Sequence, residues 1–316
     1  MSDTELARFL PDWHGFGITD GGFDRLTEVL EQLEGLALPW PVWVENVLPM
    51  RIARFRVEDF ERLCASGALV WVAVGASGAR AIRVAFCRRG QITRLLTSAG
   101  RIPAALEEED DLRSRIERHL AQYGACFQTE LELEFAGSDD GAARSELGEA
   151  LRQLMLDGAI MNDTLAPLKN YGRRAAKSSR GLTRRASSWS AGAGGRWSLV
   201  HAANSPTAAD STGAGTRKAI ATAEMLLVRY GLVTREVVAA EQCVEGFAAV
   251  YPVLKQMEES GRIRRGFFLK GCPAGSLPCP AWLTGCELRP MHRFASMRPK
   301  LACYRHWIRR TLMAVF

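Results

Sequence analysis

The sequence predicts an α+β fold that is predominantly helical and is a tandem array of one repeated unit. Three segments end alike: the last turn of an amphipathic helix meets a glycine and continues into a β-rich run. They recur at spacings of roughly 90–100 residues, which is typical of a repeated supersecondary unit. In the last copy three helices precede a short basic β hairpin, the plan of a winged helix. The segments are FERLCASGALVWVAV ending at Val74, LRQLMLDGAIMNDTL ending at Leu165 and LKQMEESGRIRRGFFL ending at Leu269.

The first copy follows an upstream extension that contains Trp13-His14-Gly15 and that we interpret as the end of a preceding part. Apolar spacing predicts three helices, the second with Pro41 in its first turn and Pro49 at its end. Two β-rich runs then follow. The expected helices are Phe23–Leu36, Trp40–Pro49 and Val57–Ser66, and the expected strands are Leu69–Val74 and Arg80–Cys87.

The second copy follows the acidic cluster Glu107–Asp111. Apolar residues line one face of a helix over residues 112–120, and Ala143–Leu156 is a long amphipathic helix that Gly158 ends. The run Thr129–Phe135 is short, and its pattern does not distinguish a helix from a strand.

The third copy spans Thr216–Gly271 and shows the unit most clearly. Its first helix ends at Gly231, and Thr234 offers a hydroxyl to the free amides of a short second helix. The third helix lies within Gly246–Gly261, where Pro252 either kinks it or lies close to its start.

A basic hairpin, Arg262–Lys270 with Gly266 near its turn, is the predicted wing of the third copy. Isolated charges are not buried without partners, so the cations here and on the preceding helix mark an exposed cationic face. They are Lys255, Arg262, Arg264 and Arg265.

Between the second and third copies, the run Lys169–Gly195 is rich in Gly, Ser, Ala and basic residues and holds no acidic residue. It cannot bury enough apolar surface to fold alone, so we expect a flexible basic linker. It would either follow phosphates, with Trp189 stacking on a base, or act only as a solvated tether. The candidate phosphate-binding residues of the linker are Arg173, Arg174, Lys177, Arg180, Arg184 and Arg185.

The predicted boundaries follow from these copies. We expect a first winged-helix module with its extension at residues 1–105, a second at 106–168, the linker at 169–195, a third at 196–271 and an irregular tail at 272–316.

The tail loses amphipathic periodicity from about Cys272 and becomes rich in Cys, Pro, Trp, Met and Arg. A different reading frame over Ser276–Glu287 and Cys303–Ala314 is compatible with ordinary protein sequence. We therefore hypothesise that the tail is translated out of frame. The spacing of Cys272, Cys279 and Cys286 does not match a zinc site, whose ligands usually pair two to four residues apart, so we predict no metal.

The overall charge does not by itself predict a function. Net charge is +6 over 316 residues, which is a small excess, so a prediction of nucleic-acid binding depends on local clusters of basic residues. Apolar runs are too short for a membrane span and no signal peptide begins the chain, so we expect a cytoplasmic protein with reduced cysteines.

The sequence lacks the common motifs of nucleotide-hydrolysing enzymes and serine hydrolases. No phosphate-binding loop occurs, since Gly75–Gly78 lacks the lysine and the hydroxyl that would hold phosphate and magnesium, and no nucleophile elbow occurs either. Asn162-Asp163-Thr164 could supply a catalytic carboxylate beside an amide, but we favour a turn in which these side chains bind the backbone. We therefore predict no catalytic residue.

The chain resembles a known family in several segments. These are Val47–Ala76, Leu151–Lys169, Arg196–Val200 and above all Leu226–Gly271, which are similar to the C-terminal region of bacterial large helicase-related (Lhr) proteins. The resemblance implies a DEAD/DEAH-box, superfamily 2, ATP-dependent 3′–5′ DNA helicase whose winged helices are like those of AlkZ-type glycosylases and precede a β-barrel. That barrel would fall where the tail departs from the pattern.

These arguments together predict a DNA-binding fragment of a DNA-repair helicase that lacks the motor, with ATP and magnesium used only by the parent. Expected partners are single-stranded DNA or a duplex junction, bound with little sequence selectivity, the helicase motor domains, and a second copy of the chain. Two alternatives remain open. The first is a glycosylase-like module that acts on a flipped damaged base. The second is a protein-docking scaffold with an exposed apolar patch on Trp40–Val47.

Overall fold

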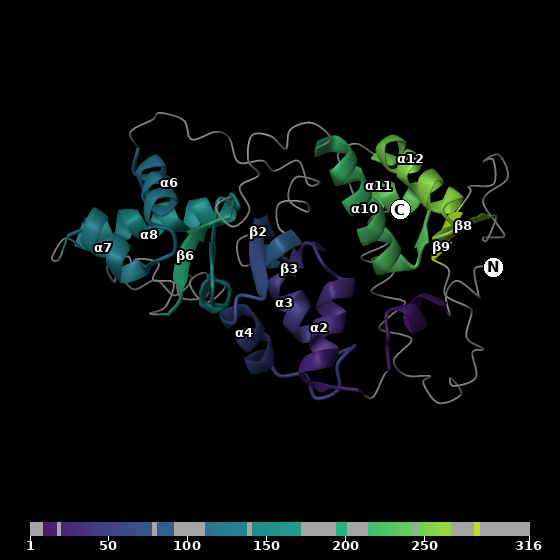
Figure 1. Ribbon diagram of the computed structural model, residues 1–316. Helices are drawn as coiled ribbons and strands as arrows, with labels where there is room; N and C mark the ends of the chain where they lie inside the picture. The colour runs from purple at the N-terminus through teal and green to yellow at the C-terminus, as the bar shows by residue number, and fades with distance from the viewer. Residues whose placement is uncertain are drawn as a thin grey trace. The chain divides into compact units, whose positions relative to one another are not determined.

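The computed structural model describes residues 9–17, 20–77, 81–91, 111–137, 141–171, 194–200, 214–241, 243, 246–266 and 281–284. They divide into two compact units, Gly15–Ala214 and the combination of Met1–His14 with Gly215–Phe316. Figure 1 shows three helical modules, each with a small sheet, in purple to blue, teal, and green to yellow along the chain.

Three three-stranded antiparallel sheets share one strand order. In each sheet the third strand lies between the first and the second, as β1-β3-β2, β4-β6-β5 and β7-β9-β8. Each module also begins with a helix, and each second strand follows its last large helix directly. The predicted tandem array of winged helices is confirmed.

The first module has an aromatic core. The rings of Phe60 and Phe86 lie 4.6 Å apart, and the indole of buried Trp43 donates a hydrogen bond to the carbonyl of Val84 at 3.0 Å. The apolar patch proposed on Trp40–Val47 is therefore wrong as an exposed cue, because Trp40, Trp43 and Val47 are all buried. The elements are α2 (Gly22–Gln32), β1 (Leu38–Pro39), α3 (Trp40–Val42) continuing into η1 (Trp43–Val47), α4 (Val57–Ala65), β2 (Leu69–Ser77), β3 (Ala81–Arg88) and η2 (Arg89–Gln91).

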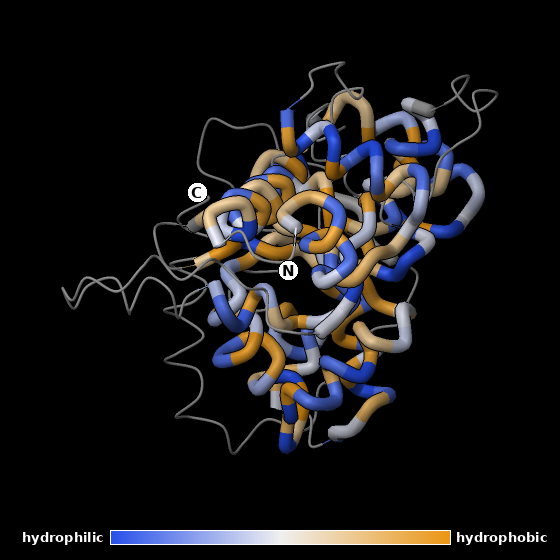
Figure 2. The backbone as a smooth tube through the Cα atoms, turned by 90° about the vertical axis from the view of Figure 1, so that its left-hand side faces the viewer, coloured by the Kyte–Doolittle hydropathy of each residue, from blue (hydrophilic) through white to orange (hydrophobic). Residues whose placement is uncertain are grey.

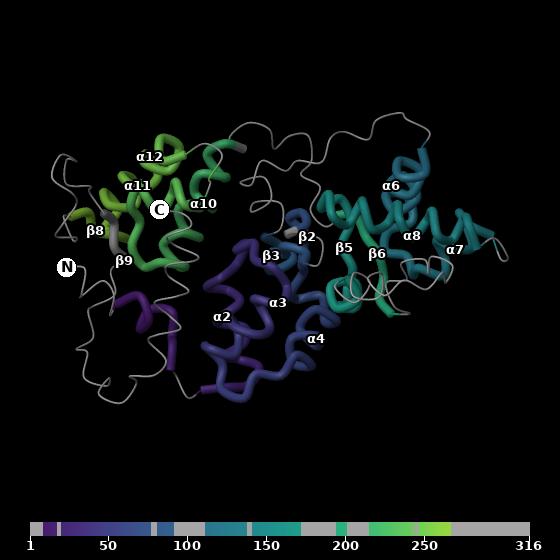
Figure 3. The backbone as a smooth tube through the Cα atoms, turned by 180° about the vertical axis from the view of Figure 1, so that it is seen from behind, coloured from purple at the N-terminus to yellow at the C-terminus, as the bar shows by residue number. Residues whose placement is uncertain are grey.

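The second module corrects a predicted boundary. The strand β6 (Arg196–Leu199), which the sequence predicts as part of the third module, pairs with both other strands of the second sheet, and Figure 3 shows it beside β5. The stretch 169–195 therefore connects two strands of one module and does not separate two modules. The remaining elements are α6 (Leu112–Tyr123), β4 (Cys126–Phe127), α7 (Gln128–Phe135), α8 (Gly141–Leu156) and β5 (Ile160–Asn162), followed by a helical segment at residues 166–171.

Strand β2 joins the first two modules. Trp71 and Ala73 face the core on one side, whereas Val70 and Val72 pack on the other side against Met161 and its neighbours from the second module. A strand buried on both faces reads as a continuous apolar run, which explains the sequence LVWVAV. One apolar cluster accordingly extends through both modules, although their sheets are separate.

The third module has its own core, formed by residues such as Ala223, Leu254 and Ile263. Its second strand pairs with residues 281–284 as far as Gly266, so the tail contributes a strand and the predicted turn at Gly266 is wrong; residues 267–270 of the predicted hairpin lie outside the described residues. The elements are α10 (Ala214–Tyr230), β7 (Leu232–Val233), α11 (Arg235–Ala240), α12 (Gly246–Glu259), β8 (Ile263–Gly266) and β9 (Ala281–Thr284).

The glycine at each helix exit adopts a left-handed conformation. Gly67, Gly158 and Gly261 all have φ near 73°, where a side chain would be strained. Beyond Gly158, the amide of Ala159 donates to the carbonyl of Leu154 at 2.9 Å, and Gly158 itself donates to Met155, which is a Schellman motif. At each of these glycines the amphipathic helix ends and the second strand of the module begins. Figure 2 shows hydrophobic and hydrophilic stretches alternating along the backbone.

Candidate nucleic-acid interface

The third module presents a recognition helix and a basic strand. Thr234 caps α11, since its hydroxyl accepts a hydrogen bond from the amide of Val237 at 3.2 Å, as the sequence predicts. Val250 and Leu254 anchor α12 in the core, and Pro252 lies inside the helix on an exposed position. Opposite the core, Lys255 is exposed to solvent.

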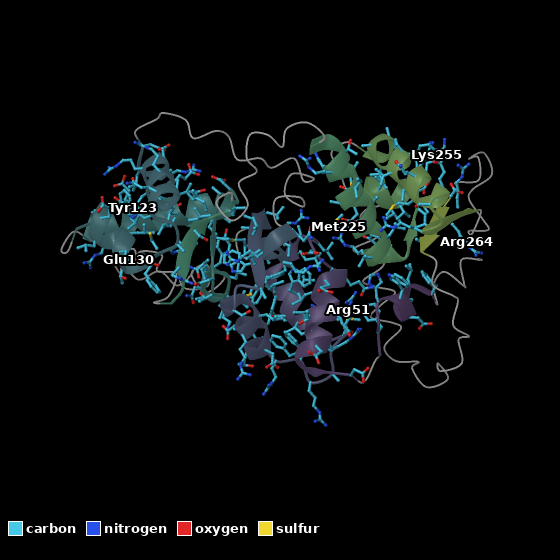
Figure 4. All side chains as sticks on the ribbon, viewed as in Figure 1. Arg51, Tyr123, Glu130, Met225, Lys255 and Arg264 are labelled. Atoms are coloured by element: carbon cyan, nitrogen blue, oxygen red, sulfur yellow. The ribbon has the colours of Figure 1, made fainter. Side chains whose placement is uncertain are left out.

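Strand β8 carries the two exposed arginines. Ile263 is buried and fixes the strand against the core, whereas Arg264 and Arg265 are exposed. Their backbones pair with residues 283 and 282 of β9. Figure 4 labels Lys255 on α12 and Arg264 on β8, both in the third module.

The predicted cations differ in whether an ion pair compensates their charge. Arg262 is 3.2 Å from Glu224 of α10, so its charge is partly compensated within the module. Lys255 lies 3.7 Å from Glu259, but both side chains are more than half exposed, and such pairs contribute little. Among the described residues, Arg264 forms no ion pair. Glu224 precedes Arg262 by 38 residues, so no local pattern predicts this partner.

Arg235 is a cation that the sequence analysis did not select. It is exposed at the first position of α11, and its guanidinium lies 5.1 Å from the ring centroid of Phe247 on α12. A cation over an aromatic face is attracted by the ring quadrupole, so this contact holds the starts of the two helices together. The signal in the sequence was weak, because the two residues lie in different helices.

A buried ionic cluster supports the same surface. Arg229, which is 1% exposed, contacts the carboxylate of Glu241 at 2.5 Å, and the hydroxyl of Tyr230 donates to the same carboxylate at 2.5 Å. Burial alone would raise the pKa of Glu241, but Arg229 and the two hydrogen bonds hold that pKa below its usual value. Burial, and then the Glu241 charge, raises the pKa of Tyr230. The cluster ties the end of α10 to the end of α11.

The corresponding helices of the other modules are acidic or already engaged. Helix α4 has Glu58 and Asp59 in its first turn, and Glu61 lies 2.6 Å from Lys169. In the second module the corresponding helix is α8, whose Arg152 forms an ion pair with Glu149, while α7, the counterpart of α11, carries glutamates and no cation. The six linker residues predicted to bind phosphate, Arg173, Arg174, Lys177, Arg180, Arg184 and Arg185, lie outside the described residues.

The Asn162-Asp163-Thr164 trio forms the predicted turn. The side-chain oxygen of Asn162 accepts from the amide and the hydroxyl of Thr164, at 2.9 and 2.7 Å. The carboxylate of Asp163 accepts from the backbone amide and the guanidinium of Arg196, at 2.7 and 3.0 Å. These oxygens connect the ends of β5 and β6. Gly195 lies so close to the trio that an added Cβ would meet Asn162 Oδ1 at 2.3 Å.

The described residues offer neither a metal site nor a membrane-spanning helix. Within the described ranges no group of three or more His, Cys, Asp or Glu side chains could hold a metal ion. No described helix is both long and apolar enough to cross a bilayer.

This architecture defines a tandem winged-helix protein, and within the described residues its third module presents exposed cations beside its recognition helix. Residues 1–89 match the model of a "Large helicase-related protein, winged-helix domain", the third of that family, and residues 212–276 match the fourth. The chain corresponds to a C-terminal winged-helix region of the large helicase-related (Lhr) family. The second module, which lies between the two matches, has the same strand order as both.

Two curated relatives share most of this chain. A "Lhr helicase/ probable uracil glycosylase" of Mycolicibacterium smegmatis is 32% identical over 287 residues, which cover 85% of this chain and 18% of the relative. A "Lhr helicase/uracil glycosylase" of Escherichia coli is 30% identical over 268 residues, covering 79% and 17%. The chain thus spans less than a fifth of the length of these relatives.

Proposed function

We propose that this chain is the DNA-binding winged-helix region of an ATP-dependent 3′–5′ DNA helicase that acts in DNA repair. One observation carries the proposal: Arg264 and Arg265 are exposed on the second strand of the third module, beside a recognition helix that presents Lys255. Cations at a wing and a recognition helix neutralise phosphates of bound nucleic acid.

The proposed binding has little base selectivity. Base readout needs Arg, Asn or Gln aimed from the recognition helix, and α12 exposes only Lys255 and Gln256 as candidates of this kind. The basic stretch that holds Arg173 to Arg185 connects neighbouring strands of the second sheet, which is the position of a wing, and it would add phosphate contacts.

ATP and magnesium would act at the motor domains of the parent helicase, which are the expected protein partners together with a second copy of the chain. The chain itself would hold single strands or duplex junctions for that motor.

Fluorescence anisotropy tests the proposal. The purified chain is titrated into labelled single-stranded, duplex and fork DNA of two unrelated sequences at several salt concentrations. We expect affinity to fall steeply with salt and to differ little between sequences. Affinity that does not change with salt would refute the proposal.

The names of both relatives favour a second candidate, removal of uracil from DNA. In the described residues the Asp163 carboxylate is already engaged by Arg196, so we expect no activity at that turn. Incubation with uracil-containing DNA and a matched thymine control, followed by cleavage at abasic sites, measures this activity directly.

A further inference from the structure

The second module exposes an apolar cluster around the start of α7. Tyr123 is 65% exposed, Phe127 49% and Leu133 73%. Six large hydrophobic side chains are strongly exposed in the described part of the chain, and three of them lie within residues 123–133. Single exposed apolar residues are normal, but a concentration of them in one place is typical of an interaction site.

Glutamates are interleaved with these apolar side chains. Phe127, Glu130 and Leu133 lie three residues apart, and Glu134 follows Glu130 by four, so these residues share the outer side of α7. Helix α7 contains no lysine or arginine. Figure 4 labels Tyr123 and Glu130, which belong to this part of the second module.

Local contacts hold the face in place. The backbone amide of Phe127 donates to the carboxylate of Glu130 at 2.6 Å, which caps the helix. The ring of His119 lies 4.6 Å from that of Tyr123 and 5.5 Å from that of Phe135. The one cation on this flank with a described ring contact, Arg115, lies over Phe135 at 5.5 Å. Such a preorganised surface needs little ordering when a partner binds.

The charge of the face selects its partner. In a winged helix the helix at this position lies near the DNA backbone, but the carboxylates of Glu130 and Glu134 would repel phosphates. A positively charged polypeptide with apolar side chains matches both features, because lysine and arginine pair with the glutamates while the apolar residues cover Phe127 and Leu133.

We propose that the outer face of α7, formed by Phe127, Glu130, Leu133 and Glu134, binds a basic amphipathic segment of a partner protein. The other modules of the array follow the plan of DNA-binding folds, whereas this face of the second module is a protein-docking surface. This inference does not depend on DNA binding by the third module.

A defined probe tests the proposal. A fluorescein-labelled helical peptide of lysine, leucine and alanine is titrated with the whole chain, beside a peptide in which glutamate replaces every lysine. Wild-type protein should bind the lysine peptide and not the glutamate peptide. Glu134→Lys should weaken binding about fivefold or more, because attraction becomes repulsion. Leu133→Ser should weaken it several-fold through loss of apolar contact.

Matched controls separate docking from general charge. Glu45→Lys makes the same charge change at an exposed glutamate of the first module and should alter peptide affinity by less than about twofold. Glu130 is left intact because it caps α7, and thermal unfolding checks that each variant folds. Equal loss with Glu45→Lys and Glu134→Lys, or equal binding of both peptides, would overturn the proposal. A gain in affinity for duplex DNA in Glu134→Lys that Glu45→Lys does not share would also overturn it, because the face would then lie near DNA phosphates.

Discussion

The wing arginines allow a quantitative test of the proposed DNA interface. We expect the double substitution Arg264→Ala and Arg265→Ala to flatten the dependence of log affinity on log salt. Each phosphate contact contributes about 0.9 to that slope for duplex DNA, so loss of two contacts lowers it by about 1.8. Raising salt from about 50 mM to about 200 mM would then reduce the affinity of the variant about 12-fold less than that of the wild type.

Arg262 provides the matched control. It lies on the same segment but is 3.2 Å from Glu224, so its charge is already partly neutralised in the free protein. We expect Arg262→Ala to change the slope by less than about half a unit. Anisotropy with one labelled duplex at five salt concentrations measures all three proteins.

Two results would refute this reasoning. An unchanged slope in the double variant would remove the wing from the DNA interface. An equal effect of Arg262→Ala would show that the ion pair with Glu224 does not decide which arginine contacts phosphate.

Four further predictions concern stability. Glu241→Ala removes the carboxylate that pairs with the buried Arg229 charge and should cost the third module about 3–5 kcal/mol, measured as faster amide hydrogen exchange in α10 and α12. Arg229→Met combined with Glu241→Leu should recover most of the loss. The pKa of Glu241 is held below its ordinary 4.5, so the ionised carboxylate stabilises the third module fully above pH 4.5. This stabilisation is lost as the pH falls through the lowered pKa, so acid should speed amide hydrogen exchange in α10 and α12. Gly158→Ala forces a side chain into φ 73° and should lower stability by about 1–2 kcal/mol, whereas Gly141→Ala, which meets open space in a helix, should not. Trp71→Phe removes the indole hydrogen bond to the carbonyl of Thr164 and should cost about 1 kcal/mol, seen as a lower thermal midpoint.

The repeated unit could be predicted from sequence because its signals are local. A glycine after the last turn of an amphipathic helix, as at Gly158, requires a backbone conformation that few other residues adopt, and apolar spacing identifies the helix before it. The cap by Thr234 likewise follows from chemistry within three residues. The structure confirms the glycine stop in all three modules and the hydroxyl cap in the third.

The strand partners could not be predicted in the same way. Strand β5 pairs with β6, more than thirty residues later, and β8 pairs with β9 across residues 267–280. Pairing over such distances depends on the sheet as a whole, and the basic composition of 169–195 suggested a linker. The boundary at residue 196 was therefore placed one strand too early.

The candidate site shows the same division between local and distant information. Exposure of Lys255, Arg264 and Arg265 followed from the cost of burying isolated charges. Compensation of Arg262 by Glu224, and the contact of Arg235 with Phe247, depend on how the helices pack, and no spacing in the sequence indicates them.

The three modules share a topology but differ in surface chemistry, and this difference has a physical cause. Burial of β2 on both faces joins the first two modules through one apolar cluster, and Glu61 of the first recognition helix is paired with Lys169. The strand order requires only apolar residues at inward positions, so outward positions are free to diverge. In the described residues, exposed arginines follow the recognition helix in the third module, whereas glutamates cover α7 in the second. We infer that one array can hold DNA at one module and a protein at another, because the fold constrains the core of each module and leaves the charge of its outer face open.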